Sequence, residues 1–504
     1  MQPVKWPHVV SPIAFGLMLA AAPAAQTPPR AQVVIVVDGL RPDDVNAETM
    51  PRLTRIGQRG IVFRDHHSVF PTVTRVNSSS MVTGVYPEGH GLLGNTIYVA
   101  SVSPTRGLDT GIYTNLEAVA RASGRLLTAP TLGELLQKAG RKLLTIGSGS
   151  SGALFLLDST GAGVSAHQDF SRPPALGSRL TEKLGSPPAH GTPNDALNRR
   201  VFDAYLTLGL DEIHPDVTFM WISDPDTTAH AKGVGTPTTL EALKLVDAGI
   251  GRVEDTLRAR GLLDRTNLIV VSDHGFSTHT SALRLDALVQ PFAKTMPDGS
   301  SDIVVAEGAI NFRAGADPAR VSAIVAALQK RPEVGAIFTR PAARGGVEGI
   351  VPGTLSFDVA RWNHQRSGEI LVSASWTDAA NAEGRRGTTA QNGVAGHGTS
   401  SPFDIHATLI AAGPDFKEHA TGDAPTANLD LAPTLLSIAG LAVPQAMTGR
   451  VIEEGLRSGP SPASLRLERL TETVKTPDGS YQLTAHRSTV AGHRYLDFTD
   501  VVRR

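Results

Sequence analysis

The chain has 504 residues, of which 41% are hydrophobic and 19% charged, a composition typical of a globular protein. Its formal net charge of −1 gives no electrostatic reason to expect a nucleic acid or an anionic membrane as a partner. Because the sequence contains no cysteine, disulfides, thiolate metal ligands and cysteine nucleophiles are excluded. Any metal must therefore be held by carboxylates and by some of the 16 histidines.

The first residues have the pattern of a signal peptide. Lys5 is the only charge before an apolar run at 13–21, and Ala22-Pro23-Ala24 offers a cleavage site of the A-x-A type. The run is too short to span a bilayer. We therefore predict a signal peptide over 1–25 and a periplasmic or secreted protein.

After this segment, predicted strands and helices alternate. Continuous apolar runs such as QVVIVV indicate strands buried on both faces of a parallel sheet, and runs with helical spacing indicate the helices between them. We predict strands at 32–37, 143–146, 217–222, 267–271 and 407–411, and helices at 50–59, 240–260 and 429–438. This order predicts an α/β fold with a mostly parallel sheet and helices on both faces.

The pattern changes between 281 and 390. Strand-like segments at 303–305, 309–313, 337–338 and 370–376 accompany a predicted helix at 318–329, and Gly- and Arg-rich stretches interrupt them. We interpret this region as a smaller α+β unit inserted into the main sheet. The predicted organisation is a first core part at 30–280, the insertion at 281–390, a second core part at 391–455 and a tail at 456–504 that contains a hairpin.

Three of the predicted strands carry Asp at or just after their carboxyl ends, where open α/β sheets bind ligands. The candidate metal ligands are Asp38 after the first strand, Asp226 and His230 after the third, Asp273 and His274 after the fourth, and His397 between two glycines. A D-x-x-x-H spacing places both side chains on one side of a helix turn, and flanking glycines allow close approach of the backbone to an ion. Each motif alone is usually a turn or a surface pair, but six oxygen and nitrogen donors in this order suit two zinc-like ions.

The segment 70–84 is rich in hydroxyl groups and is predicted to lead from a loop into a helix. Ser and Thr at such a boundary are usually N-caps. The functional alternative is a hydroxyl at a helix N-terminus, where a phosphoryl group is favoured and a bound metal would activate the nucleophile. The pattern alone leaves Thr72, Thr74 and Ser78 as candidates.

The motifs in this segment resemble those of the nucleotide pyrophosphatase/phosphodiesterase family, which belongs to the alkaline phosphatase superfamily. Pro71-Thr72-Val73-Thr74 is similar to its P-T-x-T motif, and 82–91 with Asn95 is similar to its V-T-G-x-x-P-x-x-H-G stretch and later Asn. The D-G, P-D-x-x-x-H, S-D-H-G and G-H-G motifs follow in the order of that family, and 428–436 resembles its closing helix. The resemblance spans about 33–450 and implies an alkaline phosphatase-like core, although the insertion shares none of these motifs.

The resemblance also implies a role for each candidate residue. Thr74 would be the nucleophile, and Asn95 would donate a hydrogen bond to a phosphoryl oxygen. Of the two zinc ions, one would be held by Asp226, His230 and His397, and the other by Asp38, Asp273 and His274 together with Thr74. The implied reaction is attack by Thr74 on phosphorus, formation of a phospho-threonine and its hydrolysis by water.

Two departures from the family pattern concern the substrate. The phosphodiesterases follow their nucleophile with a Phe that stacks a nucleobase, whereas this chain has Arg75. The superfamily's monoesterases with a Thr nucleophile carry a K-x-R pair that aligns with Gly149 and Ser151 here. The loss of both cations favours a diester, which has one negative charge fewer at phosphorus.

These observations lead to one hypothesis and two alternatives. The first hypothesis is an exported two-zinc hydrolase that cleaves phosphodiester or pyrophosphate bonds in small-molecule phosphate esters. One alternative is a phosphomonoesterase or phosphonate hydrolase of the same superfamily, in which Arg75 supplies the missing cation. The other is a non-catalytic metal-binding or carbohydrate-associated protein of the same fold, against which the intact ligand set with Thr74 and Asn95 argues. The oligomeric state is not indicated by the sequence.

Overall fold

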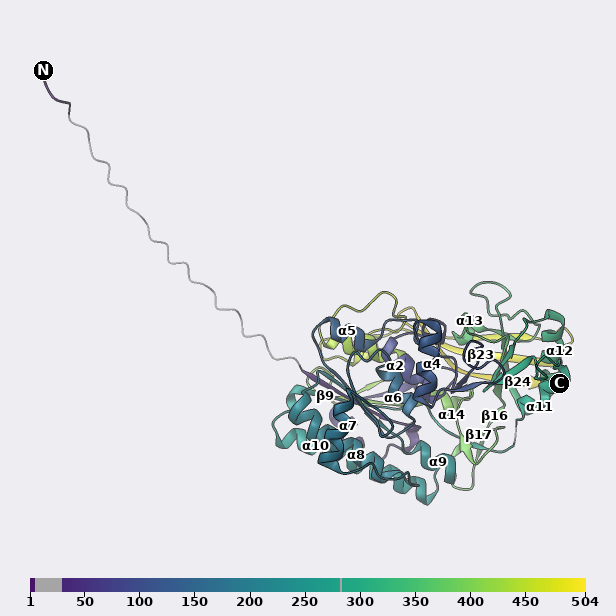
Figure 1. Cartoon of the computed structure of the whole chain (residues 1–504), viewed down its shortest axis with the longest axis horizontal. Coiled ribbons are helices and arrows are strands. Elements are labelled where there is room, and N and C mark those ends of the chain that lie inside the picture. The colour runs from purple at the N-terminus through teal and green to yellow at the C-terminus, as the bar shows by residue number, and fades with distance from the viewer. Residues whose placement is uncertain (5–29, 282) are drawn as a thin grey trace.

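The computed structural model describes residues 1–4, 30–281 and 283–504 (Figure 1). Apart from its first four residues, the predicted signal peptide at 1–25 lies outside the described residues. Within the described residues, every helix is either too short or too polar to cross a membrane.

The centre of the molecule is a ten-stranded sheet. Its main strand order is β20 (Ala420–Gly422), β2 (Ile61–His67), β19 (His406–Ala412), β9 (Thr266–Val271), β1 (Ala31–Val37), β8 (Val217–Ile222), β5 (Leu143–Gly147), β6 (Val164–Ala166) and β7 (Ser171–Arg172), and β21 (Thr426–Ala427) also pairs with β2. The strands from β9 to β6 run parallel, as predicted, and β19 runs antiparallel to both β9 and β2. The start of β19 therefore lies at the same sheet edge as the carboxyl ends of β1, β8, β9 and β2.

Helices cover both faces of this sheet because its central strands are apolar on both sides. One face, which includes Val33 and Ile35 of β1, packs against α1 (Pro51–Arg59), α8 (Asp195–Ala204) and α10 (Pro237–Ala259). The other face, which includes Val34 and Val36, packs against α2 (Thr74–Thr83), α5 (Leu132–Lys138), α6 (Ser151–Leu157) and α15 (Leu431–Ile438). Figure 1 shows α8 and α10 on the opposite side of the sheet from α2, α5 and α6. The predicted three-layer α/β architecture is confirmed.

Two smaller sheets lie beside this core. The first is five-stranded, with the order β11 (Ile303–Ala306), β12 (Ala309–Phe312), β15 (Ile370–Ala374), β13 (Val334–Thr339) and β14 (Leu355–Ser356), and α12 (Pro318–Gln329) accompanies it. The second is four-stranded, with the order β16 (Trp376–Ala380), β17 (Arg386–Thr389), β10 (Ser277–His279) and β18 (Ala395–Gly396). The single strand predicted at 370–376 is wrong, because the chain leaves one sheet after Ala374 and joins the other at Trp376. The domain limits that we drew at 281 and 390 stay a prediction.

The C-terminal tail forms a three-stranded antiparallel sheet, so the predicted hairpin of β23 (Tyr481–Val490) and β24 (His493–Arg503) is accompanied by β22 (Leu467–Lys475). These strands lie on the side of the molecule that also carries α12 (Figure 1). The tail contacts both neighbouring parts, because the Tyr481 hydroxyl donates to Gly335 O at 2.8 Å and Thr499 N donates to Ser400 O at 3.1 Å.

Candidate metal centre and nucleophile

The first ligand group lies where β1 and β9 end side by side. His274 Nε2 lies 3.4 Å from Asp38 Oδ1 and 3.1 Å from Asp273 Oδ2, and all three side chains are buried. Gly39 makes this approach possible, because its φ is +72° and a Cβ there would lie 3.0 Å from the Phe276 ring. Three residues that the sequence placed at strand ends are thus brought together.

The second ligand group is formed by the helix after β8 and by the loop after β18. Asp226 and His230 lie on the short helix α9 (Asp226–Lys232), and Asp226 Oδ1 is 3.2 Å from His230 Nε2 and 3.3 Å from His397 Nε2. The glycines around His397 allow this packing, since a Cβ on Gly396 would lie 3.1 Å from the His230 ring. The His274 and His397 rings stack with centroids 3.4 Å apart, so the two groups adjoin.

All three histidines present the same ring nitrogen to the carboxylates. The Nδ1 atoms of His230, His274 and His397 lie 2.8–3.0 Å from the backbone carbonyls of Ala395, Gly275 and Thr72, respectively. Since a carbonyl only accepts, each Nδ1 carries a proton, and each Nε2 faces the carboxylates, where it can bind a metal ion. Metal-binding histidines are typically oriented in this way.

The carboxylates of the site have buried oxygens that no protein donor satisfies. Asp38 Oδ1, Asp226 Oδ1 and Asp273 Oδ2 make no hydrogen bond within the described part of the chain. Burial and the neighbouring carboxylates raise the pKa of Asp38 well above its usual range and that of Asp273 to about 7. Burial would also raise the pKa of Asp226, but His230 and His397 hold it well below its usual value. Buried charges and unsatisfied oxygens of this kind are stabilised by cations, so the residues fit two divalent metal ions.

The structure separates the three candidate hydroxyls by their partners. Thr74 is the first residue of α2, and its Oγ1 lies 3.2 Å from His274 Nε2. In contrast, Thr72 Oγ1 donates to Thr399 O and Ser78 Oγ donates to Arg75 O. Of these three groups, Thr74 is the one that faces the ligand groups.

Asn95 is held beside the start of α2. Its Oδ1 accepts from Arg75 N at 3.1 Å, which leaves the amide nitrogen as the group available to a substrate oxygen. Its backbone N–H and that of Thr96 donate to Glu307 Oε2, and Glu307 belongs to the region that we interpret as an insertion. The region after 281 therefore contributes a contact to the loop that positions Asn95.

Three supporting residues were not identified from the sequence. Trp221 Nε1 donates to Asp38 Oδ2 at 2.8 Å, and Asn428 Nδ2 donates to Asp273 O at 2.8 Å. Glu307 is the third. Trp221 lies in a strand that we predicted, where a polar ring nitrogen in a buried apolar run is a signal for such a contact. No local pattern marks Glu307, which lies more than 200 residues from its partner Asn95.

A cavity opens in front of Thr74. Its walls include Thr74, Arg75 and Tyr113 as well as Gly149 and Ser151, the two positions that we aligned with the K-x-R pair of the monoesterases from the sequence. That alignment stays a prediction. Among the residues that line it, all in the described part of the chain, Arg75 carries the one guanidinium or ammonium group. Its Nη2 lies 3.9 Å from Asp109 Oδ1, so part of its charge is balanced within the protein.

Comparisons with solved structures support the fold of the chain. Two solved structures share its fold and so confirm the expected alkaline phosphatase-like core. Murine ectonucleotide pyrophosphatase/phosphodiesterase 5, in an inactive variant in complex with AMP, has a TM-score of 0.56 at 18% identity over 82% of this chain and 96% of that one. A variant of alkaline phosphatase PafA has a TM-score of 0.64 at 16% identity over 86% of this chain and 100% of that one.

Curated relatives match about half of this chain and less than a third of their own length. A venom phosphodiesterase of Macrovipera lebetinus is 26% identical over 55% of this chain and 29% of its own. Ectonucleotide pyrophosphatase/phosphodiesterase family member 3 of Rattus norvegicus is 23% identical over 52% of this chain and 26% of its own length. The family model "Type I phosphodiesterase / nucleotide pyrophosphatase" matches residues 32–399. Because this match covers well over half of the sequence, the chain belongs to the type I phosphodiesterase/nucleotide pyrophosphatase family.

Proposed function

We propose that this protein is a metal-dependent hydrolase that cleaves phosphodiester or pyrophosphate bonds through a phospho-threonine at Thr74. The observation that carries the proposal is the Thr74 hydroxyl, which lies 3.2 Å from His274 Nε2 at the edge of two adjoining groups of unsatisfied carboxylate oxygens. Membership in the family supports the class of reaction. The substrate is a small-molecule phosphate ester.

The two ligand groups suit two zinc ions. Asp226, His230 and His397 would hold one ion, and Asp38, Asp273 and His274 the other, with Thr74 beside it. When bound, the ions supply positive charge that lowers the pKa of the Thr74 hydroxyl and of the attacking water and stabilises the leaving oxygen. Both groups contain only imidazole and carboxylate donors, which is the donor set expected for zinc in a chain without cysteine.

The residues of the chain define two balanced steps. In the first, Thr74 Oγ1 forms a bond to phosphorus, the bond from phosphorus to the leaving oxygen breaks, and the leaving group departs with a proton. In the second, a water oxygen forms a bond to phosphorus, the bond from phosphorus to Thr74 Oγ1 breaks, a proton from the water restores the Thr74 hydroxyl, and the remaining phosphate product leaves. The Asn95 amide, held by its contact to Arg75 N, donates to a non-bridging oxygen in both steps.

The lining of the cavity supports a diester or pyrophosphate as the substrate. A phosphate monoester carries two negative charges near neutral pH and needs additional cations beyond the metal centre. Gly149 and Ser151 supply none, and Asp109 partly balances Arg75. A phosphomonoesterase or phosphonate hydrolase is the alternative that the test below separates from this proposal.

We also propose that the protein is exported to the periplasm or beyond. The proposal is supported by the sequence at 1–25, with Lys5 before a short apolar run and a cleavage site of small residues. Amino-terminal sequencing of the protein from its native host tests this, since export predicts a mature chain that begins near Gln26. A mature chain that begins at Met1 would contradict it.

The catalytic proposal is tested by comparing three chromogenic esters with the zinc-loaded protein. We expect kcat/KM for bis-p-nitrophenyl phosphate and for the p-nitrophenyl ester of TMP to exceed that for p-nitrophenyl phosphate by at least about tenfold, a margin of 1.4 kcal/mol. A chelator should abolish all three activities, and zinc should restore them. A monoester preference would reject the diester proposal and assign the missing positive charge to Arg75.

A further inference from the structure

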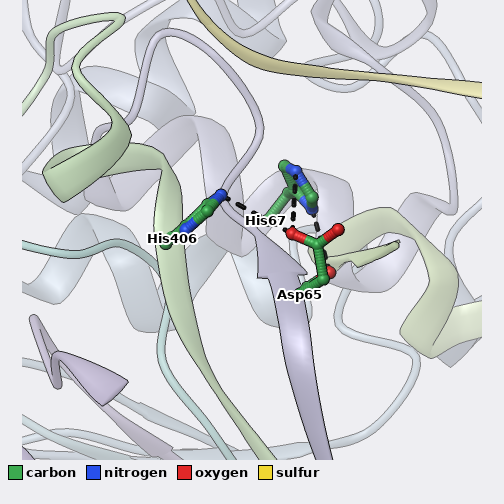
Figure 2. Close-up of side chains that lie close together, drawn as sticks. All are labelled: Asp65, His67 and His406. Carbon is green, nitrogen blue, oxygen red and sulfur yellow. Dashed lines mark hydrogen bonds and ion pairs between the residues drawn. The ribbon is translucent and has the colours of Figure 1, made fainter. Parts of the chain in front are cut away.

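A third cluster of histidine and aspartate lies outside the catalytic centre. Asp65, His67 and His406 each offer one ligand atom, and these atoms lie within 4.8 Å of one another. Figure 2 shows the three side chains pointing toward one another from neighbouring strands. Asp497 Oδ1 adjoins them, 3.1 Å from His67 Nε2. We call these four residues the seam cluster, because they lie where β24 of the C-terminal sheet meets β2 and β19 of the central sheet.

The strand pairing brings these residues together from distant parts of the sequence. His67 ends β2 and is paired with His406, the first residue of the antiparallel strand β19. Asp65 lies two residues before His67, so both side chains leave the same face of β2. His66, between them, points to the other face and bonds Thr426 and Asn428.

A β-bulge directs the fourth residue into the cluster. In the pairing of β23 with β24, His486 is opposite Phe498 and Arg487 is opposite Leu496, so Asp497 is the extra residue. Bulges commonly re-aim a side chain in this way. Ser488 Oγ donates to Asp497 Oδ2 at 2.7 Å, which leaves Oδ1 for His67.

His67 has the orientation of the catalytic histidines. Its Nδ1 lies 3.1 Å from the carbonyl of Thr426, so Nδ1 carries a proton, and Nε2 faces the oxygens of Asp65 and Asp497, where a bound ion would take the place of the Nε2 proton. His67 is 1% exposed, whereas the His406 side chain is 41% exposed. The cluster thus has one deeply held ligand and one at the surface, where an ion can enter.

The separations from Asp65 are too long for direct contacts, whereas His67 Nε2 and Asp497 Oδ1 are within hydrogen-bond distance at 3.1 Å. Asp65 Oδ1 is 3.7 Å from His67 Nε2 and 3.6 Å from His406 Nε2, both too long for a hydrogen bond. Ligands at about 2.0–2.1 Å from a tetrahedral zinc ion lie about 3.3 Å from one another. We propose that Asp65, His67 and His406, with Asp497 as the nearest fourth oxygen, form a third divalent-cation site of the zinc type.

This site would connect two parts of the fold rather than act in catalysis. Its ligands come from β2 and β19 on one side and from β24 on the other, so a bound ion joins the central and C-terminal sheets. With both imidazoles deprotonated at Nε2, the two carboxylates would balance the charge of one divalent ion. An ion that binds only the folded chain stabilises it, by about a hundredfold in the folding equilibrium at a free concentration one hundred times its Kd.

The test counts zinc ions in variants of the full chain. Wild type, His406→Ala and Asp65→Asn are dialysed to equilibrium against the same micromolar free zinc, and zinc per chain is measured by elemental mass spectrometry. We expect each variant to hold one ion fewer than wild type and to gain less in thermal midpoint when zinc is added. Diester hydrolysis at saturating zinc should stay within about threefold of wild type, because the catalytic ligands are intact.

The matched control is His486→Ala, which removes a histidine that is paired with Asp500 at 2.6 Å on the same C-terminal sheet. This variant should bind as much zinc as wild type. Equal zinc counts in wild type, His406→Ala and Asp65→Asn would overturn the proposal and identify the cluster as an imidazolium–carboxylate network. If both variants fail to fold, a wild-type chain that binds two ions or fewer at saturation overturns it. The counts are independent of turnover, so the outcome stands whether or not the proposed reaction is correct.

Discussion

The catalytic centre and the seam cluster lie at the same edge of one sheet, but they are built differently. Five of the six candidate ligands of the proposed catalytic centre follow the carboxyl ends of the parallel strands β1, β8 and β9, where short motifs such as S-D-H-G bring two candidates on consecutive residues. The seam cluster is built across strands, from β2, β19 and β24. The two sites share the histidine orientation in which Nδ1 faces a carbonyl.

The two sites differ in how deeply they are buried and in whether their carboxylate oxygens have protein partners. The catalytic group of Asp38, Asp273 and His274 is buried, and two of its oxygens have no protein partner within the described residues. The seam cluster reaches the surface at His406 and pairs His67 with Asp497. We therefore expect changes in the catalytic centre to alter turnover by orders of magnitude and changes in the seam cluster to alter zinc content and stability.

The largest effect should come from the nucleophile. Thr74→Ala should lower kcat/KM for a diester by at least about 1000-fold, because no other hydroxyl among Thr72, Thr74 and Ser78 contacts a ligand histidine. Thr74→Ser should retain measurable activity, and both variants should bind as much zinc as wild type. Turnover and zinc content measured on the same samples separate loss of the nucleophile from loss of metal. Near-normal turnover by Thr74→Ala would refute the assignment.

A smaller loss should follow from Asn95→Ala. Removal of a preorganised donor to a developing oxyanion typically costs about 100- to 1000-fold in kcat. Glu307→Gln should cost about tenfold or less, because it weakens only the contacts to the backbone of Asn95 and Thr96. Steady-state kinetics on one diester checks both variants. An effect of Asn95→Ala confined to KM would mean that the amide binds the ground state and not the transition state.

The parts of the fold that were predictable from sequence are those fixed by local patterns. The strand at 217–222 and the helix at 318–329 have the predicted limits, because each is a continuous apolar or helically spaced run between clear breaks. That the six candidate ligands come together was predictable because their motifs are short and their strands parallel. Neither the direction of β19 nor the break between Ala374 and Trp376 has a local signal.

The seam cluster was not predicted for the same physical reason. Asp65 and His67 are two residues apart, but His406 and Asp497 lie hundreds of residues away and meet them through strand register and a bulge. Register is a property of the folded sheet and not of a local sequence window. Glu307 is a similar case, since its contact with the Asn95 loop depends on how the region after 281 packs.

A more moderate effect is expected when lysine and arginine are introduced at the two positions that we aligned with the K-x-R pair of the monoesterases. Gly149→Lys combined with Ser151→Arg should raise the ratio of monoester to diester kcat/KM by about tenfold, because both positions line the cavity in front of Thr74. The Gly149 backbone is not in the left-handed region, and a Cβ there would lie 3.3 Å from the Trp221 ring, so a longer side chain can be placed with a small adjustment. Gly149→Ala with unchanged Ser151 is the control for that adjustment. An unchanged ratio would show that the alignment with the K-x-R pair does not hold.

The smallest effect concerns a buried histidine that belongs to neither cluster. His90 Nδ1 accepts from Leu92 N at 3.1 Å, so the proton is on Nε2, which lies 3.0 Å from Ser80 Oγ. This is the opposite tautomer to that of the ligand histidines.

Burial and the nearby His364 and Arg366 lower the pKa of His90 to about 3. The unfolded chain, with an ordinary pKa near 6.5, therefore binds the proton first as the pH falls. The resulting loss of stability begins below about pH 6.5 and grows by up to about 1.4 kcal/mol per pH unit until the pH reaches about 3. His90→Gln should be less stable than wild type at pH 7.5, since it loses the bond to Leu92, but the difference should shrink by about 2 kcal/mol at pH 5. Urea unfolding at both pH values measures this, with His486→Gln as the histidine control. A gap that stays constant between the two pH values would show that His90 titrates with the same pKa in the folded and unfolded chains, and the lowered pKa would then be refuted.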